Sequence, residues 1–440
     1  MTRTTSTPTA SALLPLGLFL TLFIGTGVYY TFTGVEMAFY QLKAPVAALP
    51  AVVLAVLLSK EKLNTTIEHF FKGVGHSDII AMCMIYLLAG AFSTMAVVTG
   101  GANATVNLGL SVIPTALILP GLFVVSAFIA TSMGTSMGTI GAVAPVALGI
   151  AQTAGIDIAL TAGVVMSGAM FGDNLSIISD TTIAATRSQG CEMKDKFREN
   201  VKIAMPAALI AMVIFFFASK STPVPMTSDI EWLKVLPYIT ILVLAVAGVN
   251  VFVVLSLGIL FAGIVGFVEL DGFTVATFAN TIYQGFSSMQ EIFLLSMLIG
   301  GLGELMRRQG GLAFITEQVS KVMHRHPHHQ RGGEAAIAGL VSLTNICTAN
   351  NTVAIIVAGG VAREVAEENE VTPRRSASLL DIFSCVVQGL LPYGAQALLL
   401  GQLFMLSPMT VVSHSYYCML LALAAVVAIF IRHQKSARKA

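Results

Sequence analysis

Charged residues are scarce in this sequence. Asp, Glu, Lys and Arg make up only 11% of its 440 residues, against about 25% in an average soluble domain. Hydrophobic residues make up 55%, and a chain of this composition cannot bury all its apolar surface by folding on itself. The scarcity of charge therefore excludes an ordinary soluble protein and indicates an all-α membrane protein.

The sequence also lacks the motifs expected of a metalloenzyme or an ATP-driven pump. It contains neither an HExxH zinc motif nor a phosphate-binding glycine loop. Its five cysteines stand singly, without a CxxC pair, so we expect reduced core residues. The net charge of +1 gives no sign of a nucleic-acid partner. We expect a protein that is not an enzyme and has no resident cofactor.

Apolar runs long enough to cross a bilayer recur along the chain. Roughly 20 apolar residues are needed to cross about 30 Å of hydrocarbon. Loops rich in Lys and Arg lie on the cytoplasmic side, and this rule gives one path of about 10 transmembrane helices that leaves only Lys43, Lys220 and Lys234 outside. The expected spans are 13–32, 44–59, 79–99, 157–186, 203–219, 232–247, 252–268, 292–306, 378–406 and 411–431. We therefore predict a multi-pass protein of a bacterial inner membrane with both termini in the cytoplasm.

Three segments of the first half recur in the second half in the same order. The matching pairs are 66–73 with 280–285, 90–101 with 300–311 at an offset of 210, and 135–139 with 348–352 at an offset of 213. The path through the membrane places the loops of the first copy outside and those of the second copy inside. Copies of opposite orientation with interrupted helices are typical of secondary transporters.

This repeat divides the chain into two inverted halves. We predict a first repeat over 1–220, with five spans and an outward-opening re-entrant hairpin at 113–153. The second repeat, over 229–440, should contain five spans and an inward-opening hairpin at 333–364. Arms of about 10 to 12 residues would carry the tip of the second hairpin to roughly half the hydrocarbon thickness. The stretch 113–131 is also long enough to cross fully, and the sequence leaves this alternative open.

Polar residues interrupt four of the apolar runs, at 130–139, 172–182, 344–352 and 391–396. Every backbone polar group in lipid needs a partner, so irregular backbone survives only where it lines a polar or protein-buried site. Free N–H groups at a helix N-terminus favour anions, and free carbonyls at a C-terminus favour cations. The residues expected to bind substrate or ion at these hairpin tips and breaks are Thr135, Ser136, Thr139, Asn345, Thr348, Asn350, Asn351, Thr352 and Gln396.

Acidic residues are rare inside the apolar runs, where such groups are functional by default. Either Asp173 or Asp180 should carry the cation and the proton; Asp173 lies at the break itself, whereas Asp180 is placed to cap the helix that resumes. Asp381 is open between a site and a structural role, and Glu304 should pair with the arginines that follow it. The residues expected around the ion and proton are Asp173, Asn174, Ser176, Ser179, Asp180, Thr181, Thr182 and Asp381.

The segment Gly172-Asp-Asn-Leu-Ser-Ile-Ile-Ser-Asp-Thr-Thr182 resembles the NhaC-type family of sodium/proton antiporters, within the ion transporter superfamily. The segment 381–396 is similar to the C-terminal signature of that family, and the similarity extends over about 13–431. The chain departs from the family pattern at Asn174, where the family has Lys, and at Ile177, where it has Pro. The resemblance implies sodium/proton antiport by alternating access in the lipid bilayer.

A second function stays open, because the family also includes carriers of amino acids or small carboxylates coupled to sodium or protons. Sodium/proton exchange would need one carboxylate for which both cations compete, whereas a carrier would hold a substrate carboxylate at the hairpin tips. A channel would leave the inverted repeat unexplained. The His-rich loop 324–329 should be solvated, with metal binding or pH sensing as the alternative. The sequence leaves the oligomeric state open, a homodimer included.

Overall fold

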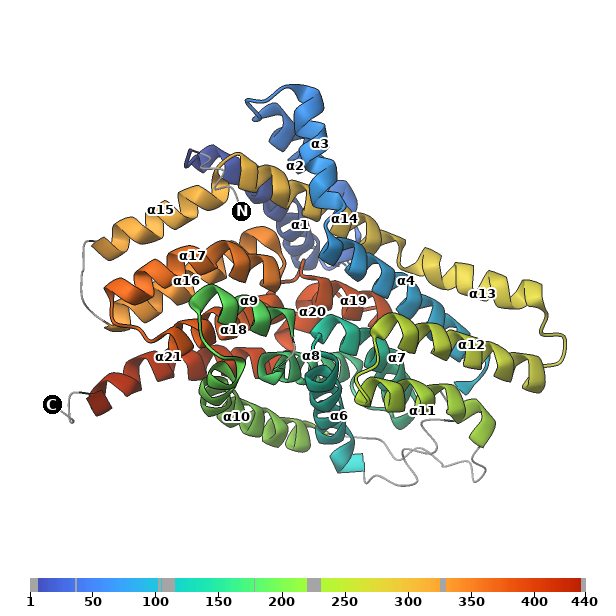
Figure 1. The fold of residues 1–440 in the computed structure, drawn as a ribbon. Helices are drawn as coiled ribbons and strands as arrows, with labels where there is room; N and C mark the ends of the chain where they lie inside the picture. Colours follow the sequence, from blue (N-terminus) through green and yellow to red (C-terminus); the bar gives the residue numbers. More distant parts are fainter. Residues whose placement is uncertain are drawn as a thin grey trace.

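The computed structural model describes residues 7–35, 38–101, 104, 115–177, 179–219, 231–324 and 330–436. Within these ranges the chain forms α-helices joined by short turns, together with the 3₁₀ helices Ala10–Leu13, Ala38–Tyr40 and Thr115–Leu117, and no strand (Figure 1). The all-helical class predicted from the composition is confirmed.

The first half of the chain supplies the helices α1 (Leu14–Phe32), α2 (Ala44–Leu57), α3 (Leu63–Val74), α4 (Ser77–Val98), α6 (Ile118–Met133), α7 (Ser136–Ala154), α8 (Ile158–Leu175), α9 (Asp180–Gln189) and α10 (Met193–Ala218). The second half supplies α11 (Trp232–Val246), α12 (Val251–Glu269), α13 (Val275–Ser288), α14 (Gln290–Arg308), α15 (Gly311–His324), α16 (Gln330–Thr348), α17 (Asn351–Glu368), α18 (Pro373–Leu390), α19 (Ala395–Phe404), α20 (Pro408–Ser413) and α21 (Tyr416–Ser436).

Seven helical stretches in the described part are long and apolar enough to cross a membrane, or up to eight if the bent pair α13–α14 counts as one span. The seven are Ala10–Phe32, Ser77–Val98, Ser136–Ala154, Ile158–Gln189, Met193–Ala218, Val251–Glu269 and Pro373–Phe404. The helices α2, α6 and α11 are apolar but shorter. The chain is thus a multi-pass membrane protein, with fewer helices that meet this length than the ten spans read from hydropathy.

The second predicted hairpin, 333–364, corresponds to α16 and α17, but its arms are longer than expected. The two helices have 19 and 18 residues, or about 27 to 29 Å at 1.5 Å per residue. The expectation of an unwound tip over 344–352 is wrong, because α16 continues to Thr348 and only Ala349 and Asn350 separate the helices. Ala349 makes this short turn by adopting a left-handed backbone with φ of 50°.

Small residues allow α3 and α4 to cross α13 and α14 closely. A Cβ atom added to Gly73 would collide with the backbone of Gly300, and one added to Gly90 would collide with the backbone of Gly285. Between α4 and α14, the Tyr86 hydroxyl lies 3.1 Å from the Ser296 Oγ, and these two residues are 210 positions apart. The Cys83 Sγ and the Phe293 carbonyl oxygen, 3.7 Å apart, have the same sequence separation.

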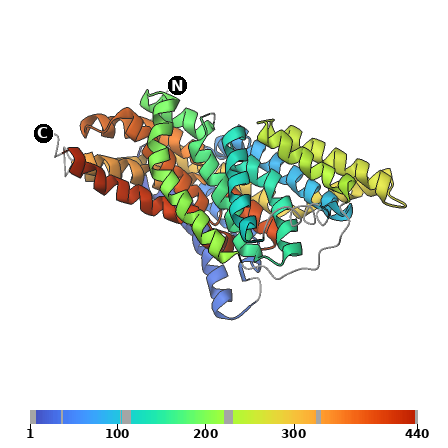
Figure 2. The ribbon, with the colours of Figure 1, turned by 90° about the horizontal axis from the view of Figure 1, so that it is seen from below.

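The two broken spans lie in the interior. Figures 1 and 2 show α11 to α13 extending to one side of the molecule and α15 to α17 with α21 extending to the other. Between them, α8 with α9 and α18 with α19 are the most buried of the candidate spans together with α7. The fold thus places both broken helices where irregular backbone is shielded from lipid.

Candidate functional site

The break between α8 and α9 is held by its own polar side chains. Ser179 caps α9, because its Oγ accepts the Thr182 N–H at 3.3 Å. The Thr182 hydroxyl donates to the Ser176 carbonyl at 2.7 Å, and the Ser176 hydroxyl donates to the Thr131 carbonyl at 3.0 Å. The prediction that Asp180 caps this helix is wrong by one residue: Asp180 is the first residue of α9 and its side chain is exposed.

Asp173 lies in the last turn of α8 and is only 4% exposed. Its Oδ2 accepts a hydrogen bond of 2.9 Å from the hydroxyl of Ser136, the first residue of α7, and the Ser136 backbone N–H also bonds this carboxylate. The α8 backbone approaches α6 closely at Gly172, where an added Cβ would collide with the Ala127 carbonyl oxygen. The N-terminus of α7 thus provides the partial positive charge that stabilises a carboxylate.

A chain of amides connects this carboxylate to the turn between α16 and α17. The Gln396 amide donates to the Ser136 Oγ at 3.1 Å, and the Gln388 amide donates to the Gln396 Oε1 at 2.8 Å. The same Gln388 amide donates to the Ala349 carbonyl at 3.2 Å. Sequence reasoning missed Gln388, because a single glutamine within a predicted helix does not interrupt the apolar pattern of that helix.

The remaining polar residues of the two hairpins mostly serve their own helices. Thr135 and Asn350 cap α7 and α17, accepting the N–H groups of Gly138 at 3.3 Å and Val353 at 3.0 Å. The Thr139 and Thr348 hydroxyls donate to carbonyls one turn earlier, and the Asn345 amide donates to the Ser384 carbonyl. The Asn351 Oδ1 accepts the Thr352 N–H at 3.0 Å.

These elements enclose a cavity of about 120 Å³, several times the roughly 10–15 Å³ that one water needs. The predicted residues that line it are Thr135, Ser136, Asp173, Asp180, Thr181, Asn350, Asn351, Thr352 and Gln396. The predicted residues that do not are Thr139, Asn174, Ser176, Ser179, Thr182, Asn345, Thr348 and Asp381. Two lining residues with polar side chains were not predicted, Gln388 and Asp78. The lining includes three carboxylates and no Lys, Arg or His.

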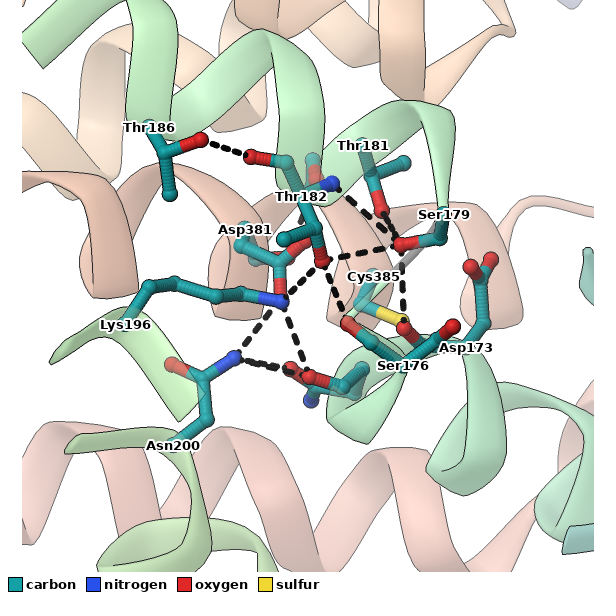
Figure 3. A network of polar contacts seen from close by, with 12 residues as sticks. Asp173, Ser176, Ser179, Thr181, Thr182, Thr186, Lys196, Asn200, Asp381 and Cys385 are labelled. Carbon is teal, nitrogen blue, oxygen red and sulfur yellow. Dashed lines mark hydrogen bonds and ion pairs between the residues drawn. The ribbon is translucent and has the colours of Figure 1, made fainter. Parts of the chain in front are cut away.

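Outside the cavity lining, Lys196 forms a buried polar cluster with the broken span α8–α9 (Figure 3). Its side chain is 0% exposed, and its Nζ lies 2.8 Å from the Asp381 Oδ2. The ammonium also donates to the Asn174 carbonyl at 3.0 Å and the Thr182 Oγ1 at 2.6 Å. The expected spans 157–186 and 203–219 left Lys196 in the loop between them, which is wrong, because α10 already begins at Met193 and the Lys196 side chain is buried.

Asn200, one turn further along α10, completes this cluster. Its amide donates to the Asn174 carbonyl at 2.9 Å, the Asn174 Oδ1 at 2.7 Å and the Asp381 Oδ2 at 2.7 Å. The available sequence signal was a Lys and an Asn four positions apart on one helix face. Asp381, left open between site and structure, is therefore the ion-pair partner of Lys196 and not a cavity-lining acid.

Other predictions have simpler outcomes. Glu304 pairs with Arg307 and Arg308, each at 2.6 Å, as predicted. All five cysteines are free, and all but Cys191 are buried. The expectation that the chain contains no hydrolase serine motif is wrong as a matter of pattern, because residues 134–138 fit G-x-S-x-G. The Ser136 hydroxyl is engaged with Asp173, however, and no histidine lines the cavity around it. Residues 325–329 of the His-rich loop lie outside the described residues.

The family of the chain follows from comparison with known proteins. The model of the Na+/H+ antiporter family matches residues 1–220 and 226–433. The Na(+)/H(+) antiporter NhaC of Bacillus subtilis is 27% identical over 73% of this chain and 76% of its own length. The malate-2H(+)/Na(+)-lactate antiporter of Bacillus subtilis is 25% identical over 66% of this chain and 64% of its own length. The arginine/ornithine antiporter ArcD of Halobacterium salinarum is 23% identical over 88% of this chain and 85% of its own length.

Among solved structures, the Alcanivorax borkumensis YdaH transporter aligns with 96% of this chain and 98% of its own, with a TM-score of 0.40 and 14% identity, a similarity too low to define the fold. The family match covers nearly the whole chain, and the resemblance read from residues 172–182 is confirmed. The chain is not an enzyme; it belongs to the Na+/H+ antiporter family of secondary transporters.

Proposed function

We propose that this protein exchanges sodium ions for protons by alternating access, with Asp173 as the carboxylate for which the two cations compete. One observation carries the proposal. The buried charged residues of the described part are Asp173, Lys196, Glu199, Glu334, Arg375 and Asp381, and each of them except Asp173 takes part in an ion pair there. Among these residues Asp173 is thus the one whose charge a cation from solution could neutralise.

The surroundings of Asp173 support a small cation as the transported species. The cavity adds Asp78 and Asp180 to Asp173 and contains no basic side chain, so its potential draws cations in and keeps anions out. Serine, threonine, asparagine and glutamine side chains also line it, beside apolar residues such as Met82 and Ile85, and the oxygens of these polar side chains suit hard cations. A proton and a sodium ion would each neutralise Asp173, and binding of one excludes the other.

We infer that the alternation between the two sides depends on two inverted repeats, 1–220 and 229–440. Together they would contain ten spans and the hairpins at 113–153 and 333–364. The contacts of α4 with α14 support it, because Tyr86 with Ser296 and Cys83 with Phe293 join positions 210 residues apart. Equivalent residues meet in this way where two copies are related by a two-fold axis.

In this account the cavity faces the cytoplasm, and both termini lie there. Asp78, at the start of α4, lines the cavity and directly follows the segment that contains Lys60, Lys62 and Lys72. Basic loops lie on the cytoplasmic side, so we infer that the cavity opens toward that side. A bacterial inner membrane is the proposed location.

A second candidate is a sodium- or proton-coupled carrier of amino acids. The favouring observation is that the first residues of both α7 and α17 line the cavity, where helix N-termini could receive a substrate carboxylate while a cavity aspartate receives its ammonium. Relatives named as malate/lactate and arginine/ornithine antiporters are consistent with a family of varied substrates. The three acids disfavour a substrate that is only anionic.

Purified protein in liposomes separates these candidates. A sodium gradient imposed on liposomes loaded with a pH indicator should drive a change of internal pH, and labelled amino acids and carboxylates should not accumulate. The Asp173→Asn protein is the control, and it should show no sodium-driven change. Accumulation of a labelled amino acid without a sodium-driven change of pH would replace the first proposal by the second.

A further inference from the structure

The ammonium group of Lys196 is fully satisfied by oxygen atoms. It has three protons, and its three partners are the Asp381 carboxylate, the Asn174 carbonyl and the Thr182 hydroxyl, at 2.6 to 3.0 Å. The three oxygens come from α18, α8 and α9, whereas Lys196 reaches them from α10. The Lys196 side chain is 0% exposed, so bulk water cannot replace these oxygens as its partners.

These partners are also the kind that binds a metal cation. A carboxylate, a backbone carbonyl and a hydroxyl are the oxygen ligands preferred by hard cations. The Asn174 carbonyl lies in the last turn of α8, where helix carbonyls are left without intrahelical partners and the helix dipole favours positive charge. The ammonium thus occupies the position that a bound cation would take.

We infer that Lys196 is a built-in cation in an oxygen-lined cation site, and that this site would take a sodium or lithium ion if the ammonium were removed. Asn200 keeps the site shaped without Lys196, since its amide bonds both the Asn174 carbonyl and the Asp381 Oδ2. Replacement of Lys196 by alanine removes the side chain beyond Cβ, which would leave the oxygens in place and open the space between them.

If the protein exchanges sodium for protons as proposed above, the charge of Lys196 also affects how many cations are exchanged in each cycle. The buried charges around the break are Asp173, Asp381 and Lys196, with a net charge of −1. One monovalent cation or one proton therefore neutralises them. Without the ammonium the net charge is −2, and two cations would be required. Lys196 in this way fixes the exchange at one cation for each cycle.

The test uses the full-length protein in detergent and measures the midpoint of thermal unfolding against sodium chloride, with choline chloride at equal ionic strength. It is done in an Asp173→Asn background, so that sodium binding at Asp173 does not contribute. With Lys196→Ala added, sodium should raise the midpoint in a saturable way and choline should not. With Lys196→Met, which removes the charge but fills the space, sodium should act no better than choline.

Two further variants complete the test. The Asp173→Asn protein with Lys196 intact should show no sodium effect beyond choline, because the ammonium holds the site; a specific sodium effect there would overturn the inference even if Lys196→Ala cannot be purified. Adding Asp381→Asn to Lys196→Ala should abolish the sodium effect. Equal responses of Lys196→Ala to sodium and choline would show a structural ion pair only. All these readouts are independent of whether wild-type protein exchanges sodium for protons.

Discussion

The two broken spans are built alike but are charged differently. The helices α8 and α18 have 18 residues each, α9 and α19 have 10 each, and corresponding positions are 215 residues apart. The Cys385 thiol meets the Met170 carbonyl at 3.4 Å across this same separation. In this register Asp173 of α8 corresponds to Gln388 of α18. The same backbone thus presents a carboxylate in one half of the chain and a neutral amide in the other.

Under the proposed function, this difference would leave one exchangeable charge in a pair of similarly built spans. Asp173 accepts hydrogen bonds from the first residue of α7, whereas Gln388 donates to Gln396 and to the Ala349 carbonyl. Gln388 thereby links the turn of the second half to the carboxylate of the first half without adding a charge. We expect the first position to decide which cation binds and the second to transmit the binding.

Loss of the charge at Asp173 is the change with the largest expected effect. Asp173→Asn should reduce sodium-driven proton flux to the level of empty liposomes, because an amide keeps the shape but binds neither a proton nor a sodium ion. The matched control is Asp180→Asn, an exposed cavity acid, which should lose only a fewfold of the flux. Flux is compared at equal amounts of reconstituted protein. Full flux in Asp173→Asn would refute the assignment, and an inactive Asp180→Asn would move the carrier role there.

The second prediction concerns Gln388, the neutral residue that corresponds to Asp173. Gln388→Leu leaves the Gln396 Oε1 and the Ala349 carbonyl without their donor, and a buried unsatisfied acceptor costs about 1–3 kcal/mol. Transport should fall roughly tenfold, equivalent to about 1.4 kcal/mol, with sodium affinity changed much less than the turnover rate. Gln402→Leu, on the same helix as Gln396 but bonded to the Ser288 carbonyl, is the control and should retain normal turnover. An equal decrease in both variants would contradict the coupling role.

The third prediction concerns the turn next to that amide. Asn350→Ala removes the cap of α17 and should cost about 1 kcal/mol, while transport falls severalfold because Asn350 also lines the cavity. Ser407→Ala removes the cap of α20, which lies outside the cavity lining, and should lower stability alone. The check is transport per inserted molecule together with thermal unfolding of both variants. If the two variants behave alike in transport, the tip is packing and its residues are not ligands.

The smallest effect on transport is expected from probes of the inverted orientation itself. Thr274→Cys, before α13, should react with an impermeant thiol reagent from the periplasm, and Glu368→Cys, at the end of α17, should react only from the cytoplasm. Both are made in a Cys191→Ser background, since the other cysteines are buried, and both should transport normally. Labelling of Glu368→Cys from the periplasm would contradict the inverted path.

Sequence reasoning located the breaks better than it located their partners. Gly172, Asp173 and the polar run after them identify the first break, because such residues have no other reason to interrupt an apolar helix. The repeat stays a prediction, and its register at the tips differs from the helix caps of the structure. The match of Thr135 with Thr348 gave an offset of 213, whereas the helix caps are Thr135 and Asn350. The prediction matched two threonines, whereas the two residues with the same capping role lie two positions further apart.

The missed residues share one physical cause. Lys196 was assigned to a loop by the rule that basic residues stay in the cytoplasm, but a lysine near a helix start can extend inward when a carboxylate such as Asp381 is there to pair with it. Asp78 directly precedes the expected span 79–99 and was not among the predicted site residues, although it lines the cavity. Both depend on contacts between helices far apart in the sequence, which periodicity and hydropathy do not report.

The most direct test of the central claim is the pH dependence of sodium binding to purified protein. If sodium and a proton compete for Asp173 alone, the apparent Kd for sodium should rise about tenfold for each unit of acidification below the pH at which the site binds its proton, and should level off above it. Asp173→Asn should show no sodium binding in this range. A wild-type Kd that stays constant with pH, or a pH dependence that survives in Asp173→Asn, would contradict exchange at a shared carboxylate.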